Sequence, residues 1–186
     1  MSKNLLFTEV LQQDVSNIVE ACNDEVTRYY LVTLPYPYTK DDAIEFIDNS
    51  AKQWEAGSVL RWALRCRTTE EFIGVVELRY DCKFDSIGVW CAPKMRGNGY
   101  ITEAIKTIVK WSVEQKWTKN NEIYYACMPQ NIPSASVARS VGFKLLGAKQ
   151  SHEPYIHRDT GMTYQYLYSI YAPDDIEQFS SWSEYL

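Results

Sequence analysis

The chain has 186 residues, of which 46% are hydrophobic, 14% aromatic and 23% charged. A chain of this length and hydrophobicity can bury a substantial core without disulfide bonds, and its composition excludes intrinsic disorder. The formal net charge of -5 provides no broad basic surface for phosphate groups, so we expect no direct nucleic-acid partner. We therefore expect one globular domain that occupies residues 1–186.

The cysteines and histidines indicate neither a disulfide framework nor a metal site. The five cysteines are odd in number and scattered, and only two histidines accompany them. Free thiols in a reducing compartment fit this pattern best. The sequence has no apolar run long enough to cross a membrane, and the segment after Met1 lacks the apolar run of a signal peptide. We expect a cytoplasmic protein without a metal and without membrane contact.

The first third of the chain predicts one strand and two helices. The apolar segment Leu5–Glu9 favours a strand, and apolar residues then recur at helical spacing after a cap at Asp14 or Ser16. A proline-containing loop is expected over Tyr29–Tyr38. Thr39 is then positioned to cap a second helix, which ends before the next glycine.

The middle of the chain predicts three strands, a helix and a further strand. The segments Val59–Arg67, Phe72–Arg79 and Ile87–Ala92 are typical of an antiparallel meander. From Tyr100 onward the apolar residues recur at helical spacing, and Ile123–Met128 is again typical of a strand. We expect the last strand of the meander, the helix and the further strand to form a crossover unit.

The last third predicts a short helix over Pro133–Val141 that ends at Gly142, followed by strands at Phe143–His152 and Thr163–Tyr171. The tail from Pro173 has no clear pattern. Together the elements predict an α/β (α+β) fold with a mixed, mainly antiparallel sheet of about seven strands and about four flanking helices. An exposed edge strand at Thr163–Tyr171 would offer a surface for a homodimer, an alternative that the sequence leaves open.

A turn that contains glycines lies between the third strand of the meander and the helix at Tyr100. Gly97 and Gly99 allow successive backbone N–H groups to turn inward, and the N-terminus of the following helix attracts an anion. Thr102 adds a hydroxyl group. This pattern predicts a phosphate-binding turn over Arg96–Thr102. The alternative is that the two glycines only shape a loop before a helix.

The turn matches neither of two common nucleotide-binding fingerprints. Thr102 occupies the position at which GxGxxG has its third glycine, and no GK[ST] follows as in a P-loop. NAD and ATP are therefore disfavoured as ligands.

The turn and a second motif resemble those of the GNAT N-acetyltransferases, and within them the RimJ/RimL-like group that acetylates ribosomal protein N-termini. The coenzyme A motif of this family, Arg/Gln-x-x-Gly-x-Gly/Ala, matches Arg96 and Gly99, with Ile101 in place of the final small residue. The second motif matches Asn131-Ile132-Pro133-Ser134 and Gly142-Phe143. Further matches, within a resemblance over roughly residues 5 to 170, are Leu34-Pro35-Tyr36-Pro37, Asp41-Asp42-Ala43, Ile73-Gly74-Val75, Ile87-Gly88-Val89-Trp90 and Thr102-Glu103-Ala104.

The resemblance implies a sheet that splits into a V between two strands, with acetyl-CoA along Val89–Ala92 and its pyrophosphate at Arg96–Thr102. A main-chain N–H near Cys91 would polarise the thioester carbonyl. No metal is implied. The residues that the resemblance assigns to acetyl-CoA binding are Val89, Trp90, Cys91, Arg96, Gly97, Asn98, Gly99, Tyr100, Ile101, Thr102, Asn131 and Ser134.

The resemblance also implies catalytic roles for one hydroxyl group and one carboxylate. Ser134 would lie near the coenzyme A thiol and protonate the departing thiolate or hold its charge; many relatives use a Tyr at the position of Ala138 as the acid. The alternative for Ser134 is a residue that bonds the backbone at a helix start. Glu153 is the first candidate for the base that deprotonates the amine, and Glu77 is the second. For either, a solvated surface carboxylate is the alternative.

We expect direct transfer of an acetyl group from acetyl-CoA to a primary amine, without an acyl-enzyme at Cys91. On the resemblance, a peptide or protein N-terminal α-amine ranks first as the acceptor, ahead of a polyamine, an amino acid or an aminoglycoside. A domain that binds coenzyme A as a regulatory ligand without catalysis is the alternative from another class. The tyrosines of the loop over Tyr29–Tyr38 would either shape the acceptor pocket or pack at the edge of the core.

Overall fold

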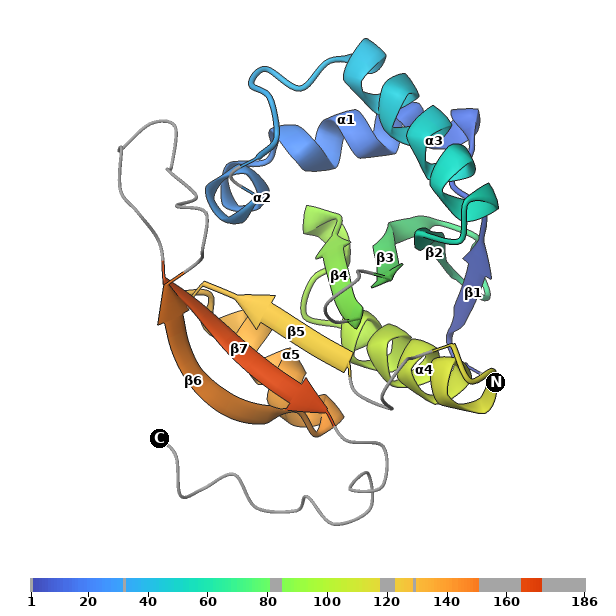
Figure 1. Cartoon of the computed structure of the whole chain (residues 1–186). Coiled ribbons are helices and arrows are strands. Elements are labelled where there is room, and N and C mark those ends of the chain that lie inside the picture. Colours follow the sequence, from blue (N-terminus) through green and yellow to red (C-terminus); the bar gives the residue numbers. More distant parts are fainter. Residues whose placement is uncertain are drawn as a thin grey trace.

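A seven-stranded sheet with five α-helices around it forms the described part of the chain (Figure 1). The structure is a computed structural model that describes residues 2–31, 33–80, 85–117, 123–128, 130–150 and 165–171. The strands are β1 (Leu5–Thr8), β2 (Val59–Cys66), β3 (Phe72–Tyr80), β4 (Asp85–Cys91), β5 (Ile123–Cys127), β6 (Lys144–Gln150) and β7 (Gln165–Tyr171). The helices are α1 (Val15–Asn23), α2 (Glu25–Tyr30), α3 (Lys40–Glu55), α4 (Tyr100–Glu114) and α5 (Ile132–Val141), and two short 3-10 helices span Gln12–Asp14 and Pro93–Met95.

The strand order is β1-β2-β3-β4-β5-β7-β6. Each described neighbouring pair is antiparallel except β4 and β5, which are parallel. The parallel pair follows from the connection through α4, because a helical crossover brings the chain back in the same direction. The predicted mixed, mainly antiparallel sheet is confirmed.

The predicted position of the last strand is wrong. An exposed edge strand is expected at Thr163–Tyr171, but β7 pairs with β5 on one side and with β6 on the other. β6 therefore forms this edge of the sheet. Apolar alternation identifies a strand but not its neighbours, and here the last strand inserts between two earlier ones.

The sheet splits between β4 and β5, as the resemblance implies. These strands pair only through Ser86 with Tyr124 and Ile87 with Tyr125 among the described residues. Figure 1 shows the two strands diverging beyond this short contact. The divergence leaves the end of β4, up to Cys91, with a neighbour on its β3 side only in the described part of the sheet.

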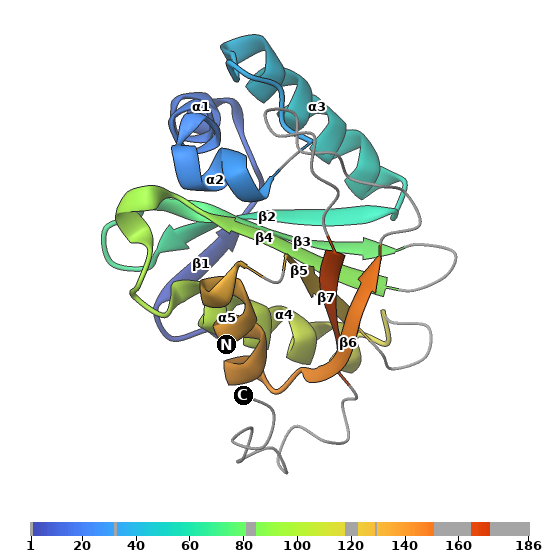
Figure 2. The same ribbon diagram turned by 90° about the vertical axis from the view of Figure 1, so that its left-hand side faces the viewer.

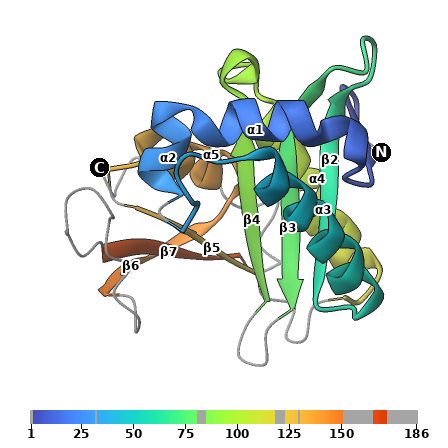
Figure 3. The same ribbon diagram turned by 90° about the horizontal axis from the view of Figure 1, so that it is seen from above.

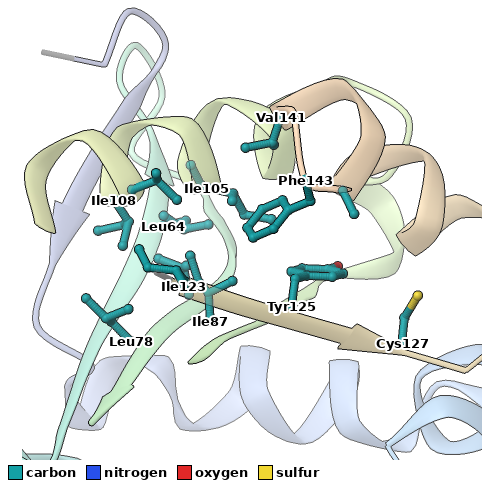
Figure 4. Close-up of a cluster of buried hydrophobic side chains, with 14 of the residues drawn as sticks. Leu64, Leu78, Ile87, Ile105, Ile108, Ile123, Tyr125, Cys127, Val141 and Phe143 are labelled. Atoms are coloured by element: carbon teal, nitrogen blue, oxygen red, sulfur yellow. The ribbon is translucent and has the colours of Figure 1, made fainter. Parts of the chain in front are cut away.

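Helices cover both faces of strands β1 to β4 (Figure 2). The helices α1, α2 and α3 lie on one face and α4 and α5 on the other, and α1 runs across β2, β3 and β4 (Figure 3). One hydrophobic cluster, which includes Ile18, Ile47 and Val75, packs under α1 and α3. The other includes Ile105 and Phe143 and packs under α4 and α5 (Figure 4). The sheet therefore separates two cores.

The helix boundaries follow the capping signals of the sequence. Thr39 caps α3 in a capping box, in which its hydroxyl accepts a hydrogen bond from the Asp42 N–H at 3.2 Å. The carboxylate of Asp42 in turn accepts one from the Thr39 N–H at 2.7 Å. Gly142, with φ of 108°, ends α5 in the left-handed conformation that glycine adopts without steric cost.

The helix α2 is absent from the prediction, which has a loop over Tyr29–Tyr38. Tyr29 and Tyr30 instead form the last residues of α2. Asp24 caps this helix, because its carboxylate accepts a hydrogen bond from the Thr27 N–H at 2.9 Å. With six residues, α2 is too short for apolar periodicity to reveal it, and Asp24 is the signal that would have indicated its start.

We predict that Phe143→Ala lowers the free energy of unfolding by about 3–5 kcal/mol, because it leaves a cavity at a fully buried site. Urea unfolding followed by circular dichroism measures the change. Leu145→Ala is the control. Leu145 lies two residues further along the chain and is 38% exposed, so this variant should lose far less free energy of unfolding. Equal losses in the two variants would contradict the assignment of Phe143 to the core.

Candidate active site

A cavity of about 600 Å³ occupies the split between β4 and β5. Its walls come from the end of β4, the glycine turn with the start of α4, the first turns of α5, and α2. The residues that line it are Val26, Thr27, Tyr30, Leu31, Val89, Trp90, Cys91, Met95, Arg96, Gly97, Asn98, Gly99, Tyr100, Ile101, Thr102, Tyr125, Asn131, Pro133, Ser134, Ser136, Val137 and Ser140. All twelve residues that the resemblance assigns to acetyl-CoA binding are among them.

The glycine turn forms one end of the cavity. Gly97 and Gly99 have φ angles of 79° and 76°, in the left-handed region that favours glycine. A Cβ atom added at either residue would meet no atom within 4 Å, so the backbone conformation and not crowding selects glycine here. The Asn98 side chain holds the turn through hydrogen bonds to the carbonyls of Met95 and Arg96, both at 3.2 Å.

The N-terminus of α4 follows the turn directly, with Gly99 as its N-cap residue. The first N–H groups of a helix have no partner within the helix, and the helix dipole places partial positive charge there. Tyr100, Ile101 and Thr102, the first residues of α4, line the cavity. This end of the cavity therefore suits an anionic group such as a phosphate.

The end of β4 directs backbone groups into the split. The N–H of Ala92, just after β4, donates a hydrogen bond to the carbonyl of Ile73 in β3 at 2.8 Å. Because alternate residues of a strand direct their N–H groups to opposite edges, the N–H groups of Cys91 and Val89 point away from β3 and toward the split. These groups can donate hydrogen bonds to a carbonyl oxygen bound in the cavity.

Arg96 joins the turn to α2 instead of extending into solvent. One guanidinium nitrogen lies 2.6 Å from the Asp24 carboxylate and 2.8 Å from the Thr27 hydroxyl. Partial burial of Asp24 disfavours its ionised form, but the hydrogen bonds from Arg96 and Thr27 outweigh this and lower its pKa. The N-terminus of α2 is thus fixed to the turn.

The other end of α2 is attached across the cavity. The Tyr30 hydroxyl donates a hydrogen bond to the carbonyl of Gln130, just before α5, at 3.2 Å. Of the four tyrosines expected either to shape an acceptor pocket or to pack at the edge of the core, Tyr30 lines this cavity. Tyr38 is 5% exposed and packs in the core under α1 and α3, whereas Tyr36 is 62% exposed.

Asn131 and Ser134 lie on the α5 wall and have separate tasks. Asn131 is the N-cap of α5, and its side-chain oxygen accepts a hydrogen bond from the Ser134 N–H at 3.2 Å. The hydroxyl of Ser134 lies 2.6 Å from the hydroxyl of Tyr125. The capping role therefore belongs to Asn131, and the Ser134 hydroxyl interacts with a side chain of β5.

Tyr125 is a cavity residue that the sequence analysis did not single out. It is 4% exposed, and its ring centroid lies 5.5 Å from that of Phe143. Burial raises its pKa to about 12, although the hydrogen bond with Ser134 opposes the shift. The alternation of buried residues along β5, at Ile123, Tyr125 and Cys127, was the signal that this ring points inward. Figure 4 shows these three side chains.

Glu77, the second candidate base, is not among the residues that line the cavity. It lies in β3. Its carboxylate forms ion pairs with Arg61, at 2.5 Å, and with Arg79. Arg61 also donates to Ser50 and Gln53 of α3, so this cluster belongs to the α3 face of the sheet. Glu153 lies outside the residues that the structure describes.

Cys91 is no stronger a nucleophile than an ordinary thiol. Burial raises its pKa to about 11, while the charge of Arg96 opposes the shift, so the thiolate form is rare at neutral pH. Among the described residues, Cys22, Cys66, Cys91 and Cys127 are free thiols. Within the described ranges no group of three His, Cys, Asp or Glu side chains could hold a metal ion, and no helix is long and apolar enough to cross a membrane.

Comparison with protein-family models identifies the family to which the chain belongs. The acetyltransferase (GNAT) domain matches residues 4–144, and the chain therefore belongs to the GNAT acetyltransferases. It is an acetyl-CoA-dependent enzyme of this class. No curated protein matches the chain.

Solved structures share the fold at low sequence identity. An acetyltransferase from Salmonella typhimurium that modifies the N-terminal serine of ribosomal protein L7/L12 has a TM-score of 0.76 and 16% identity, over 92% of this chain and 96% of that one. The ribosomal-protein-S5-alanine acetyltransferase of Vibrio fischeri has a TM-score of 0.77 and 14% identity, over 95% of this chain and 97% of that one. A microcin C7 self-immunity acetyltransferase, in complex with acetyl-CoA and AMP, has a TM-score of 0.75 and 18% identity, over 91% of this chain and 93% of that one. At sequence identities this low, the structural similarity shows that the fold is shared and nothing about the substrate.

We predict that Gly99→Ala weakens acetyl-CoA binding about tenfold in a calorimetric titration, because alanine at positive φ costs about 1–2 kcal/mol and distorts the turn. Gly57→Ala is a matched control. Gly57 has φ of 63° after α3, and a Cβ atom there also meets no atom within 4 Å. The Gly57→Ala variant should lose a similar amount of stability and keep its affinity for acetyl-CoA. Equal affinities in both variants and the unaltered protein would contradict a phosphate-binding role of the turn.

Proposed function

We propose that this enzyme transfers the acetyl group of acetyl-CoA directly to the N-terminal α-amine of a peptide or protein. One observation carries the proposal: the same cavity in the split of the sheet is lined by a glycine turn that suits an anion and by Ser134 on α5. Its volume of about 600 Å³ lies within the range of small-molecule sites.

The lining of the cavity fits the chemical character of acetyl-CoA. The pyrophosphate would lie at Gly97, Gly99 and the N-terminus of α4, where backbone N–H groups suit negative charge. The apolar side chains of Val89, Pro133 and Val137 suit the pantetheine arm. The N–H groups of Val89 and Cys91 would then donate to the thioester carbonyl and stabilise the oxyanion that forms when the amine attacks.

Two side chains complete the proposed mechanism. The Ser134 hydroxyl would hydrogen-bond the departing sulfur and hold its charge. Glu153 would take the proton of the amine, and it is preferred over Glu77 because two guanidinium groups already bind the Glu77 carboxylate on the α3 face. A carboxylate committed to two ion pairs must break them before it accepts a proton.

The preference for a peptide acceptor rests on likeness to two enzymes that act on ribosomal protein N-termini. The formal net charge of -5 also favours the approach of a cationic ammonium group. The microcin C7 self-immunity enzyme shares the fold as well, so the acceptor must be tested directly.

The acceptor is tested by the release of coenzyme A thiol with a panel of amines. We expect turnover with peptides that begin with serine or alanine, and none with the same peptides acetylated at the N-terminus, which differ only in the reacting group. Spermidine and free amino acids serve as the small-amine arm. Turnover with spermidine alone would refute the peptide assignment, and acetyl-CoA binding without turnover on any amine would indicate a coenzyme A-binding regulator instead.

The catalytic assignments predict that Ser134→Ala and Glu153→Gln each lower kcat about 100-fold and leave the Kd for acetyl-CoA unchanged, because neither residue contacts the pyrophosphate. Steady-state kinetics and calorimetry measure the two quantities.

Glu77→Gln should instead lower the free energy of unfolding by about 2 kcal/mol, since it weakens buried charged hydrogen bonds. A larger loss of kcat in Glu77→Gln than in Glu153→Gln would reverse the choice of base.

A further inference from the structure

We propose that Tyr125 is a positioning residue, whose hydroxyl donates to Ser134 and so directs the Ser134 hydrogen toward the sulfur that leaves in the reaction. The inference rests on the proposed function. It comes from the 2.6 Å contact between the two hydroxyl oxygens, which joins the buried strand β5 to the α5 wall of the cavity.

Either hydroxyl group can donate in this contact, and the proposed donor is Tyr125. A serine hydroxyl has one hydrogen, which it can give to a single acceptor at a time. The buried Tyr125 phenol keeps its proton at neutral pH, because burial raises its pKa to about 12, and it is therefore available as a donor. When Tyr125 donates to the Ser134 oxygen, the serine hydrogen becomes free for another acceptor in the cavity.

A second polar neighbour of Ser134 among the described residues, Cys127, does not compete for that hydrogen. The Cys127 thiol interacts with the Ser134 side chain, but burial raises the pKa of Cys127, so it remains a neutral thiol. A neutral sulfur is a weak acceptor, whereas the sulfur that leaves a thioester carries a full negative charge. The serine hydrogen is therefore directed to the departing sulfur, and donation from Tyr125 strengthens this second hydrogen bond through polarisation.

The reaction step balances without a change in the tyrosine. The amine nitrogen bonds to the carbonyl carbon, and the carbon–sulfur bond then breaks with its electron pair on sulfur. The Ser134 hydroxyl holds the thiolate by a hydrogen bond until the thiolate takes a proton from solvent. The proton lost by the amine goes to the base, and both hydroxyl groups keep their hydrogens.

The rigid placement of Tyr125 fits this task. The residue is 4% exposed, and its ring packs against Phe143, also buried, at a centroid distance of 5.5 Å. Substitution by phenylalanine keeps this packing and removes only the hydroxyl group. Tyr124→Phe is the matched control, because Tyr124 precedes it in β5, faces the other side of the sheet and is absent from the cavity lining.

The test is a double-mutant cycle. We expect Tyr125→Phe to lower kcat about tenfold with an unchanged KM for acetyl-CoA, which is the scale of one hydrogen bond that strengthens in the transition state. In a Ser134→Ala background the same change should have little further effect, because Tyr125 acts through Ser134. Tyr124→Phe should behave as the unaltered enzyme. Equal losses in both backgrounds, or no loss in either, would overturn the proposal.

A binding measurement separates this proposal from the proposed function. Calorimetry compares coenzyme A with desulfo-coenzyme A, which lacks the sulfur, in the unaltered protein and in Tyr125→Phe. We expect a preference for coenzyme A that Tyr125→Phe reduces; an undiminished preference, or none in the unaltered protein, would overturn the role of Tyr125. Binding of acetyl-CoA without turnover on any amine would refute the proposed function instead, and the comparison of the two ligands would still decide the role of Tyr125.

Discussion

The short parallel contact between β4 and β5 is the constraint on which the site depends. Two residue pairs, Ser86 with Tyr124 and Ile87 with Tyr125, join these strands in the described sheet, and the strands then separate. Backbone groups of β4 that a continuous sheet would satisfy face a cavity instead, where they need a ligand or water. The divergence of these two strands therefore opens the cavity, whose lining the turn and α5 complete.

Much of this site was predictable because its backbone leaves local signals. Gly97, Gly99 and Gly142 occupy positions with positive φ that few other residues tolerate. Thr39 marks the start of α3 for another local reason, because its side chain caps the helix. Each such position limits which residue types fit there, independently of the rest of the chain, so a single sequence reveals it. The strands and the longer helices were predictable from apolar spacing in the same local way.

The parts that escaped prediction depend on distant partners. The place of β7 between β5 and β6 is a choice of neighbour, and the link between α2 and the turn joins Asp24 to Arg96 across 72 positions of the chain. The Tyr125 hydroxyl has a partner only because a strand and a helix converge. The ion pairs of Glu77 with Arg61 and Arg79 could not be predicted, since a carboxylate in a strand looks the same in sequence whether or not arginines bind it.

The separation of the two cores by the sheet has a consequence for divergence within this fold. The α5 wall and the glycine turn rest on the core that contains Phe143, whereas α1 and α3 rest on the core that contains Ile47. Substitutions in distant, unconnected sites add nearly independently in free energy. One side can therefore accumulate changes under selection while the other keeps its shape, and the fold can survive, as it does among proteins that share 14 to 18% of their residues with this chain.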